Sequence, residues 1–332
     1  MTTPPSVAVS IVVPVYQSQR TLARCLDALS RQTRRDFEII LVDSSPGGEC
    51  ESVAAAAAAV PGLRYTHSPR RLLPQAAREV GVEMARAPLL LFTDPDCYAA
   101  PDWLEELLAA HDAAGGPVAG ALACHGRRWL DSGIHLCKFS KWLPAGERRA
   151  VDMGPTAALL IPRRLFERAG GFGGHGLLGD IVLSWTLRRD GETIWFAPRA
   201  VASHHHLDTW RSFVAERYRR GKIFARLRLD WLRAGRPTAL GYLLASALPL
   251  RLATNLAHAA RHAARARSLG SFALQLPVVA AGHGASLAGE AAAYAGRLVR
   301  GKNPMADAKR RGRTGSSDAV EARSISAADG RR

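Results

Sequence analysis

The sequence of 332 residues predicts an α/β fold with a mainly parallel sheet flanked by helices. Two patterns predict it. Short runs of β-branched and apolar residues alternate with stretches whose apolar residues recur at helical spacing. The composition, 47% hydrophobic and 22% charged, is typical of a globular protein with a sizeable core. Parallel sheets bind ligands at the carboxyl ends of their strands, so residues at those ends are the first candidates for function.

The first half of the chain contains four expected strands separated by helices. The first (VAVSIVV) ends before Pro14, the second (FEIILV) ends at Asp43, and the fourth (LLLFT) ends at Asp94. In a parallel sheet these three ends would meet at one crevice. The expected strands are 7–13, 37–42, 63–67 and 89–93, and the expected helices are 21–31, 51–60, 74–85 and 102–110.

The second half of the body continues with a Gly-rich loop that ends at Gly179. An amphipathic helix beginning at Asp180 follows it, and a later strand leads to the run His204-His205-His206. The expected elements here are a strand at 157–161, helices at 163–169 and 180–189, and strand segments at 193–196 and 200–203.

The net charge of +16 is concentrated at the C-terminus. Residues 1–210 carry 22 Lys and Arg against 22 Asp and Glu, whereas residues 211–332 carry 23 against 7. We expect a neutral domain at 1–210, a basic Ala- and Leu-rich helical region at 211–300, and a disordered basic tail at 301–332. Such a basic appendage favours an anionic membrane surface as a partner. Nucleic acid is not expected, because the basic residues are not interleaved with stacking aromatic residues.

The basic region gives an ambiguous membrane signal over residues 238–290. Thr238–Leu250 lacks charge but is shorter than the roughly 20 residues that cross a bilayer. In Arg251–Arg267 the basic residues fall on one helical face. Ser268–Gly289 lacks Asp, Glu, Lys and Arg but contains Pro277. Crossing the membrane and lying in its interface both remain open.

Several classes of protein and of site are disfavoured. Five cysteines with no C-x-x-C argue against a disulfide framework and a structural zinc site. The N-terminus lacks the basic region of a secretory signal, so we expect a reduced, cytosolic setting. Neither a G-x-x-x-x-G-K-[ST] nor a G-x-S-x-G motif occurs. The G-x-G-x-x-G match at 171–176 follows a helix, not a strand, so it does not predict a dinucleotide site.

Three acidic positions carry the strongest chemical signals. Asp94 and Asp96 follow a buried strand, where two carboxylates can hold Mg²⁺ or Mn²⁺ and, through the ion, a diphosphate; a simple turn is the alternative. Asp43 could accept a hydrogen bond from a nucleobase or cap its strand. Asp180 could be a general base or only an N-terminal helix carboxylate. His204, or a neighbouring histidine, could complete the metal ligands.

These residues lie in segments that resemble family 2 glycosyltransferases, which have the GT-A fold. The resemblance covers residues 7–206. It rests on VSIVVPVYQSQRTLARCLDALSRQTRRDFEIILVDSS, on AAREVGVEMARAPLLLFTDPDC with its D-x-D motif, and on GGFGGHGLLGDIVLSWTLRRDGETIWFAPRAVASHH. It implies an inverting, metal-dependent transferase that uses a nucleotide-sugar donor.

The resemblance also implies roles for single residues. It places Asp43 against the base, Arg78 near the diphosphate and Asp180 as the catalytic base. Asp94 and Asp96 match the D-x-D pair, of which Asp94 also lies against the donor. The remaining matches are Pro14, Val15 and Tyr16, which line the nucleoside pocket, and His204, which completes the metal site.

Three departures from the family pattern bear on function. Ser44 stands where a second acid is usual, and Gly179 replaces the usual glutamate before Asp180. The Q-x-x-R-W signature of processive synthases is absent. The resemblance thus implies transfer of a single sugar, with uridine the expected base.

The function expected from the resemblance is addition of that sugar to a glycan or lipid-linked acceptor during cell-surface or extracellular polysaccharide synthesis. The enzyme would work at the cytoplasmic face of the cell membrane, either peripheral or anchored by the C-terminal region. The alternatives are a nucleotidyltransferase on a similar fold and a degenerate transferase that serves as a membrane-bound scaffold.

Overall fold

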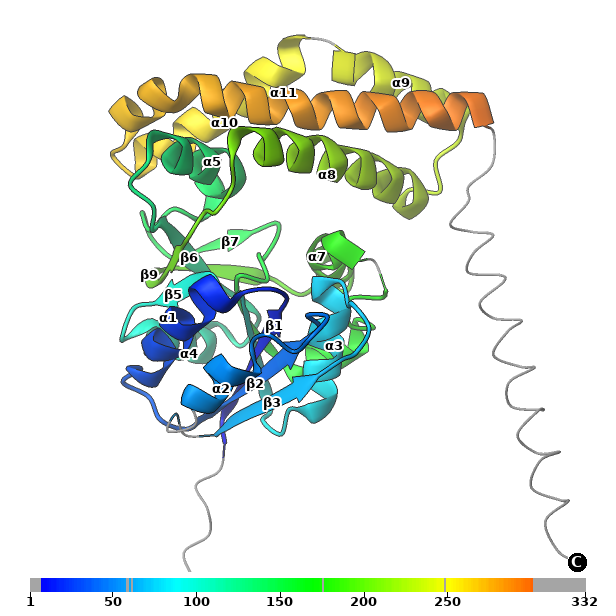
Figure 1. Ribbon diagram of the computed structural model, residues 1–332. Coiled ribbons are helices and arrows are strands. Elements are labelled where there is room, and N and C mark those ends of the chain that lie inside the picture. The colour runs from blue at the N-terminus through cyan, green and yellow to red at the C-terminus, as the bar shows by residue number, and fades with distance from the viewer. Residues whose placement is uncertain (1–6, 58–59, 61, 175, 248, 301–332) are drawn as a thin grey trace, which may run out of the picture.

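The computed structural model describes residues 7–300 apart from 58–59, 61, 175 and 248. An α/β body lies beneath a layer of long C-terminal helices (Figure 1). The tail at 301–332, which the sequence analysis expected to be disordered, lies outside the described residues.

The body is built on one mixed sheet of nine strands in the order β3-β2-β1-β4-β8-β6-β9-β5, with β7 paired to β9. The order β3-β2-β1-β4 is parallel throughout, as expected. Beyond it, β8 is antiparallel to both β4 and β6, while β6 and β9 are parallel. The strands are β1 Val9–Val15, β2 Phe37–Asp43, β3 Leu63–His67, β4 Leu89–Thr93, β5 Cys97–Ala99, β6 Val118–Cys124, β7 Arg149–Val151, β8 Ala158–Pro162 and β9 Ile194–His204.

Helices cover both faces of the sheet in the manner of a βαβ protein (Figure 1). Pro74 opens α3, where its fixed φ suits the first helical turn, and Gly115 ends α4 in the left-handed conformation. The helices of the body are α1 Gln19–Ser30, α2 Glu51–Ala56, α3 Pro74–Met84, α4 Trp103–Ala114, α5 Trp129–Phe139, α6 Arg163–Arg168 and α7 Gly179–Arg189, with short 3-10 turns η1 Ser140–Trp142 and η2 Gly176–Leu178.

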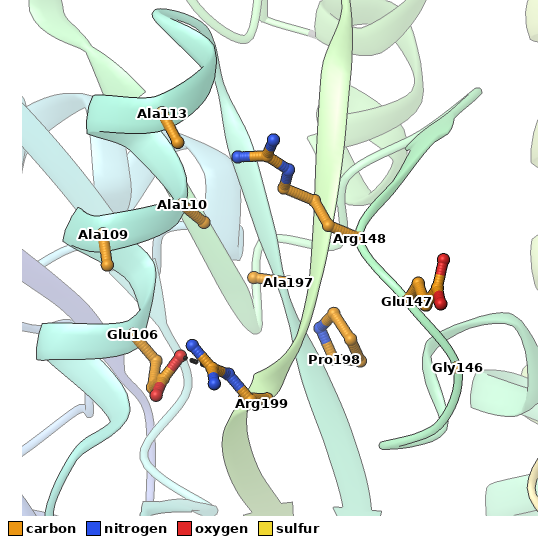
Figure 2. A pocket seen from close by; sticks show the side chains of 10 residues that line it. All are labelled: Glu106, Ala109, Ala110, Ala113, Gly146, Glu147, Arg148, Ala197, Pro198 and Arg199. Atoms are coloured by element: carbon orange, nitrogen blue, oxygen red, sulfur yellow. Dashed lines mark hydrogen bonds and ion pairs between the residues drawn. The ribbon is translucent and has the colours of Figure 1, made fainter.

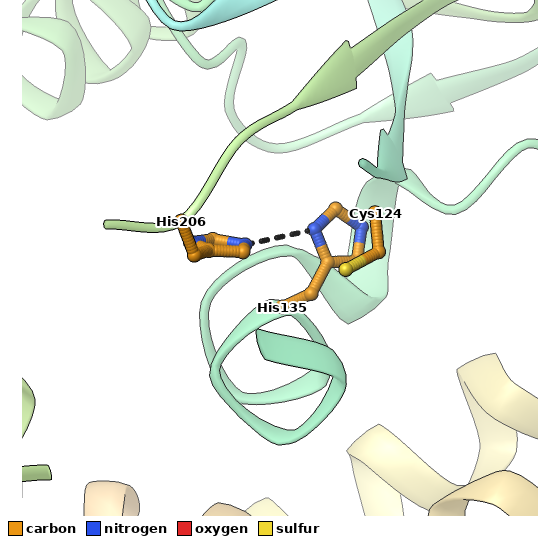
Figure 3. Close-up of side chains that lie close together, drawn as sticks. All are labelled: Cys124, His135 and His206. Carbon is orange, nitrogen blue, oxygen red and sulfur yellow. Dashed lines mark hydrogen bonds between the residues drawn. The ribbon is translucent and has the colours of Figure 1, made fainter. Parts of the chain in front are cut away.

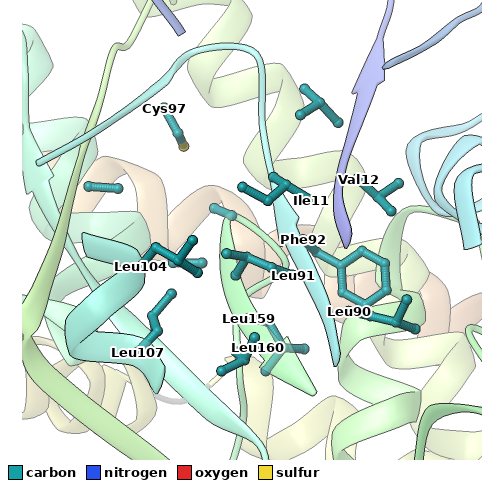
Figure 4. Packing of buried hydrophobic residues seen from close by; sticks show 14 of the residues in the cluster. Ile11, Val12, Leu90, Leu91, Phe92, Cys97, Leu104, Leu107, Leu159 and Leu160 are labelled. Atoms are coloured by element: carbon teal, nitrogen blue, oxygen red, sulfur yellow. The ribbon is translucent and has the colours of Figure 1, made fainter. Parts of the chain in front are cut away.

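The core lies between the central strands and these helices (Figure 4). Every residue of β1 and β8 is buried, as expected for strands covered on both faces. Phe92 of β4 packs against the rings of Phe166 and Phe172, at centroid distances of 5.4 and 5.2 Å. This cluster fixes β4 and thereby the residues that follow it.

The C-terminal layer consists of α8 Trp210–Trp231, α9 Arg236–Ala247, α10 Pro249–Arg265 and α11 Leu269–Arg300. Glycines let α8 and α11 approach closely, because a Cβ at Gly221 or Gly289 would lie 2.0 Å from a carbonyl oxygen of the other helix. Buried Glu290 of α11 pairs with Arg228 of α8 at 3.2 Å and with Arg251 of α10 at 2.9 Å.

The C-terminal layer also packs on the body, since Phe213 of α8 and Val278 of α11 share one apolar cluster with Ile134 of α5. Among the described residues, no helix has the length and apolar character required to span a bilayer.

Candidate active site

The parallel strands bring the predicted strand-end residues to one edge of the sheet. Val15 of β1 pairs with Asp43 of β2, and β4, which also pairs with β1, ends at Thr93 just before Asp94. Pro14 and Val15 are buried in β1, so Tyr16, which is partly exposed, is the one of these three residues that presents its side chain at the edge. The guanidinium of Arg71 lies 4.4 Å above its ring.

Asp94 and Asp96 meet His204 because β5 pairs with the end of β9. Cys97 lies opposite His204 in this pairing, and the His205 amide donates a 2.8 Å hydrogen bond to the Asp96 carbonyl. The Nε2 atom of His204 lies 3.7 Å from Oδ1 of Asp96. The donor atoms of Asp94, Asp96, Cys97 and His204 all lie within 4.8 Å of one another.

This cluster has the chemistry of a divalent-cation site. Burial is the main cause that raises the pKa of Asp96, and a bound cation would lower this pKa again. His204 has a buried Nδ1 with no hydrogen-bond partner among the described residues. Burial raises the pKa of the Cys97 thiol well above its usual range, and the nearby charges of Asp96 and Asp94 raise it further. Two carboxylates and one imidazole therefore fit Mn²⁺ or Mg²⁺ better than a thiolate-bound metal.

Arg78 adds a buried positive charge beside the acidic pair. Its side chain is 2% exposed, and its Nη2 forms an ion pair with Oδ1 of Asp94. Gln75, one helical turn earlier in α3, accepts a 3.1 Å hydrogen bond from its Nη1, whereas its Nε has no partner among the described residues. The guanidinium is thus held at the cluster with one donor still available.

Asp180 lies in the first turn of α7 and faces the same charges. Burial raises its pKa above the ordinary value, while the charges of Arg220 and Arg78 act in the opposite direction and that of Asp94 raises it further. Its neighbour Gly179 is tightly enclosed, since a Cβ there would lie 2.8 Å from the Cβ of Phe172. The Phe172 ring therefore occupies the space that a glutamate at this position would need.

Asp43 lies two strands from Asp94 at the same edge but is completely buried. Its Oδ1 accepts hydrogen bonds from the amide and hydroxyl of Ser45, at 2.8 and 2.6 Å. Its Oδ2 accepts from the Cys50 amide at 3.3 Å and the Tyr65 hydroxyl at 3.0 Å. Four bonds fill the acceptor capacity of a carboxylate, so Asp43 holds the loop after β2 in place, and its contact with a nucleobase stays a prediction.

We expect Asp43→Ala to lower the free energy of unfolding by about 3 kcal/mol, because it removes a charged acceptor and leaves buried donors unpaired. Urea unfolding followed by circular dichroism measures the change. Asp27→Ala is the control, since its exposed ion pair with Arg31 should contribute at most about 1 kcal/mol. Equal stability of the two variants would contradict this structural role.

A second cluster, not identified from the sequence, lies behind His204 and consists of Cys124, His135 and His206 (Figure 3). Nδ1 of His135 lies 3.2 Å from Nε2 of His206, and its other ring nitrogen lies 3.0 Å from the Leu122 carbonyl. The ring of His206 stacks on that of His204 at 4.6 Å. The run His204-His205-His206 drew attention to His206, whereas nothing in the sequence places His135 of α5 beside it.

A separate pocket of about 480 Å³ lies between α4 and the middle of β9 (Figure 2). Alanines of α4 and the Glu106–Arg199 ion pair, at 3.0 Å, line it. None of the predicted site residues borders this pocket.

Comparison with known proteins shows which sequence family the chain resembles. Residues 10–150 match the sequence model of Glycosyl transferase family 2. The chain is 24% identical over 204 residues to the glycosyltransferase AglE of Haloferax volcanii, covering 59% of this chain and 66% of that protein. It is 30% identical over 142 residues to an undecaprenyl-phosphate 4-deoxy-4-formamido-L-arabinose transferase of Pseudomonas fluorescens, covering 39% and 40% of the two chains.

A solved structure supports the fold. The chain superposes on a Pyrobaculum calidifontis mannosyltransferase, determined with GDP-Man and Mn²⁺, with a TM-score of 0.58 and 22% identity, covering 89% of this chain and 87% of the other. The sequence match and the shared fold are consistent with one another: residues 10–150 are similar to Glycosyl transferase family 2, and the chain has the GT-A fold of its solved structural neighbour.

Proposed function

We propose that the protein transfers one sugar from a nucleoside-diphosphate sugar, with uridine the expected base, to a hydroxyl group, with inversion at the anomeric carbon. The observation that carries this proposal is the gathering of Asp94, Asp96, His204 and Arg78 at one end of the strands, with Asp180 close enough for the charges of Arg78 and Asp94 to shift its pKa. The neighbour from P. calidifontis, with GDP-Man and Mn²⁺, is consistent with a divalent cation and a nucleotide sugar.

Asp94, Asp96 and His204 would hold the cation, which when bound neutralises charge on the departing diphosphate. Arg78 would share this task through the positive charge that it holds beside Asp94. Asp180 would accept the proton of the acceptor hydroxyl as that oxygen attacks the anomeric carbon, and the bond to the diphosphate breaks on the opposite face.

The acceptor that we propose is a glycan or a lipid-linked sugar at the cytoplasmic face of the membrane, for cell-surface or extracellular polysaccharide synthesis. The P. fluorescens relative, whose name includes undecaprenyl phosphate, is consistent with a lipid-linked acceptor. Residues 1–210 would be catalytic and 211–300 would attach the enzyme to an anionic surface. Deleting the C-terminal helices is a poor test of attachment, since it would expose Phe213 and Ile134.

The experiment that tests the function measures the nucleotide released from a panel of nucleotide sugars with Mn²⁺, with Mg²⁺ and with EDTA. We expect slow, cation-dependent release of a nucleoside diphosphate even without acceptor. Release of pyrophosphate from nucleoside triphosphates would favour the nucleotidyltransferase, and no release from any donor would favour the scaffold.

A further inference from the structure

A basic groove of about 330 Å³ lies where α10 meets the body, away from the proposed donor site. Its walls come from two distant parts of the chain, the segment 141–152 around β7 and the C-terminal half of α10. It shares no residue with the cluster of Asp94, Asp96 and His204. Its basic lining residues are Lys141, Arg149, His258, Arg261, His262 and Arg265, and Asp152 is the one acidic residue in the lining.

The body side of the basic groove holds a fixed positive charge. The Arg149 guanidinium donates to the carbonyls of Lys141, Ala145 and Glu147, at 3.1, 3.4 and 3.4 Å, and lies 4.2 Å over the Phe196 ring. Burial and the charge of Arg265 lower its pKa. Lys141 lies 3.4 Å from Asp152, so the one acid in the lining already has a partner.

The α10 side adds charge that no acidic group neutralises among the described residues. Residues 258, 261, 262 and 265 fall on one helical face. Neither Arg261 nor Arg265 forms an ion pair within the part of the chain that is described. Burial, followed by the charges of Lys141, Arg265 and Arg149, lowers the pKa of His262 to about 4. The cations of the two walls therefore repel one another across the groove.

From this arrangement we propose that the basic groove binds a phosphate group, with the headgroup of an anionic lipid as its source. A phosphate would relieve the repulsion between the walls, and guanidinium groups match its oxygens in charge and geometry. Residues 301–332 are a poor internal substitute, because they carry 8 Lys and Arg against 4 Asp and Glu.

The leucines exposed on the C-terminal helices are the reason for choosing a lipid. Leu250 is 71% exposed and precedes Arg261 by 11 residues, which at 100° per residue places it on nearly the same side of α10. Other exposed leucines lie on the adjoining helices. A layer of helices that exposes both basic groups and apolar side chains is typical of a surface that rests in a lipid interface. The further exposed leucines are Leu240, Leu244, Leu269, Leu274 and Leu276.

The choice of a lipid as the source of the phosphate rests on the membrane attachment that we propose as part of the function. The binding of phosphate in the groove, in contrast, does not depend on sugar transfer. The test therefore measures binding and not activity. Full-length protein is titrated with vesicles of phosphatidylcholine plus phosphatidylglycerol, with vesicles of phosphatidylcholine alone, and with soluble glycerol phosphate. The groove variant is Arg261→Glu with Arg265→Glu, and the matched control is Arg164→Glu with Arg188→Glu, which makes the same charge change at exposed positions of the body, outside the groove and outside the region 211–300.

We expect the groove variant to bind the phosphatidylglycerol vesicles at least about tenfold more weakly, and the control to change by about twofold or less. If the groove variant lost glycerol phosphate binding but still bound the vesicles, the groove would be a phosphate site whose ligand is a soluble phosphate ester and not a lipid. Equal losses in the two variants, or no loss in the groove variant, would overturn the proposal. Arg261→Gln with Arg265→Gln repeats the test without introducing acidic groups, and thermal melting shows that each variant is folded.

Discussion

Asp180→Asn is expected to reduce kcat by about 10²–10⁴-fold while donor affinity stays within about twofold. An amide of the same size keeps the hydrogen bond from the Ile181 amide to Oδ1, which measures 3.0 Å, but it cannot take a proton from the acceptor. Because Asp180 faces Arg78 and Asp94 but makes no hydrogen bond to them, the cation site should be little disturbed. The variant therefore separates proton transfer from donor binding.

Steady-state kinetics and isothermal titration calorimetry measure the two effects of this change. Asp190→Asn, at the far end of the same helix, is the control and should keep normal turnover. Burial raises the pKa of Asp180, so kcat/KM of the native enzyme should fall on acidification at a pH above the ordinary aspartate range, as the base becomes protonated. Unchanged kcat in Asp180→Asn would refute its role as the base.

Asp96→Ala should weaken cation-dependent donor binding by at least about tenfold and remove most of the transfer activity. The side chain shares its cluster with Asp94 and His204, so its loss removes one of two carboxylates and leaves the imidazole 3.7 Å from a missing partner. Removing one ligand or its support typically lowers metal affinity by about 10–100-fold or more. The Coulombic attraction between the cation site and the diphosphate of the donor falls together with the metal affinity.

Titration of Mn²⁺, followed by titration of the donor with and without the ion, measures this loss. Asp102→Ala serves as the control, because Asp102 is exposed and makes no side-chain cap at the start of α4. If donor affinity were the same with and without the ion in the native protein, the metal-binding role of Asp96 would be wrong.

Local pattern was sufficient to predict the parallel half of the sheet. Strands β1, β2 and β4 are continuous apolar runs followed by turn residues, and the structure places each within two residues of its expected bounds. Strand β6 (VAGALAC) was missed because its small residues do not distinguish a strand from a helix. Helix α2 ends at Ala56, earlier than expected from its alanine run.

The arrangement of the site residues was predictable only in part, because local sequence pattern does not reveal contacts between distant segments. Position at a strand end predicted the grouping of Asp43, Asp94 and Pro14 at one edge, since it follows from strand order alone. The four hydrogen bonds that occupy Asp43 depend on a loop and on Tyr65 of β3, which no spacing in the sequence reveals. His135 contacts His206, whose ring stacks on His204. This contact likewise depends on the packing of α5, since His135 lies 69 residues before His204 in the chain.

The close contact between α5 and α11 ties the metal cluster to the outer helices. A Cβ at Gly133 would lie 2.5 Å from Val278 of α11, and two residues further along α5, His135 contacts His206, whose ring stacks on His204. A chimaera that received foreign C-terminal helices would therefore have a disturbed contact behind His204, the proposed metal ligand. The outer helices therefore cannot be exchanged alone, and an engineered chimaera has to exchange α5 together with them.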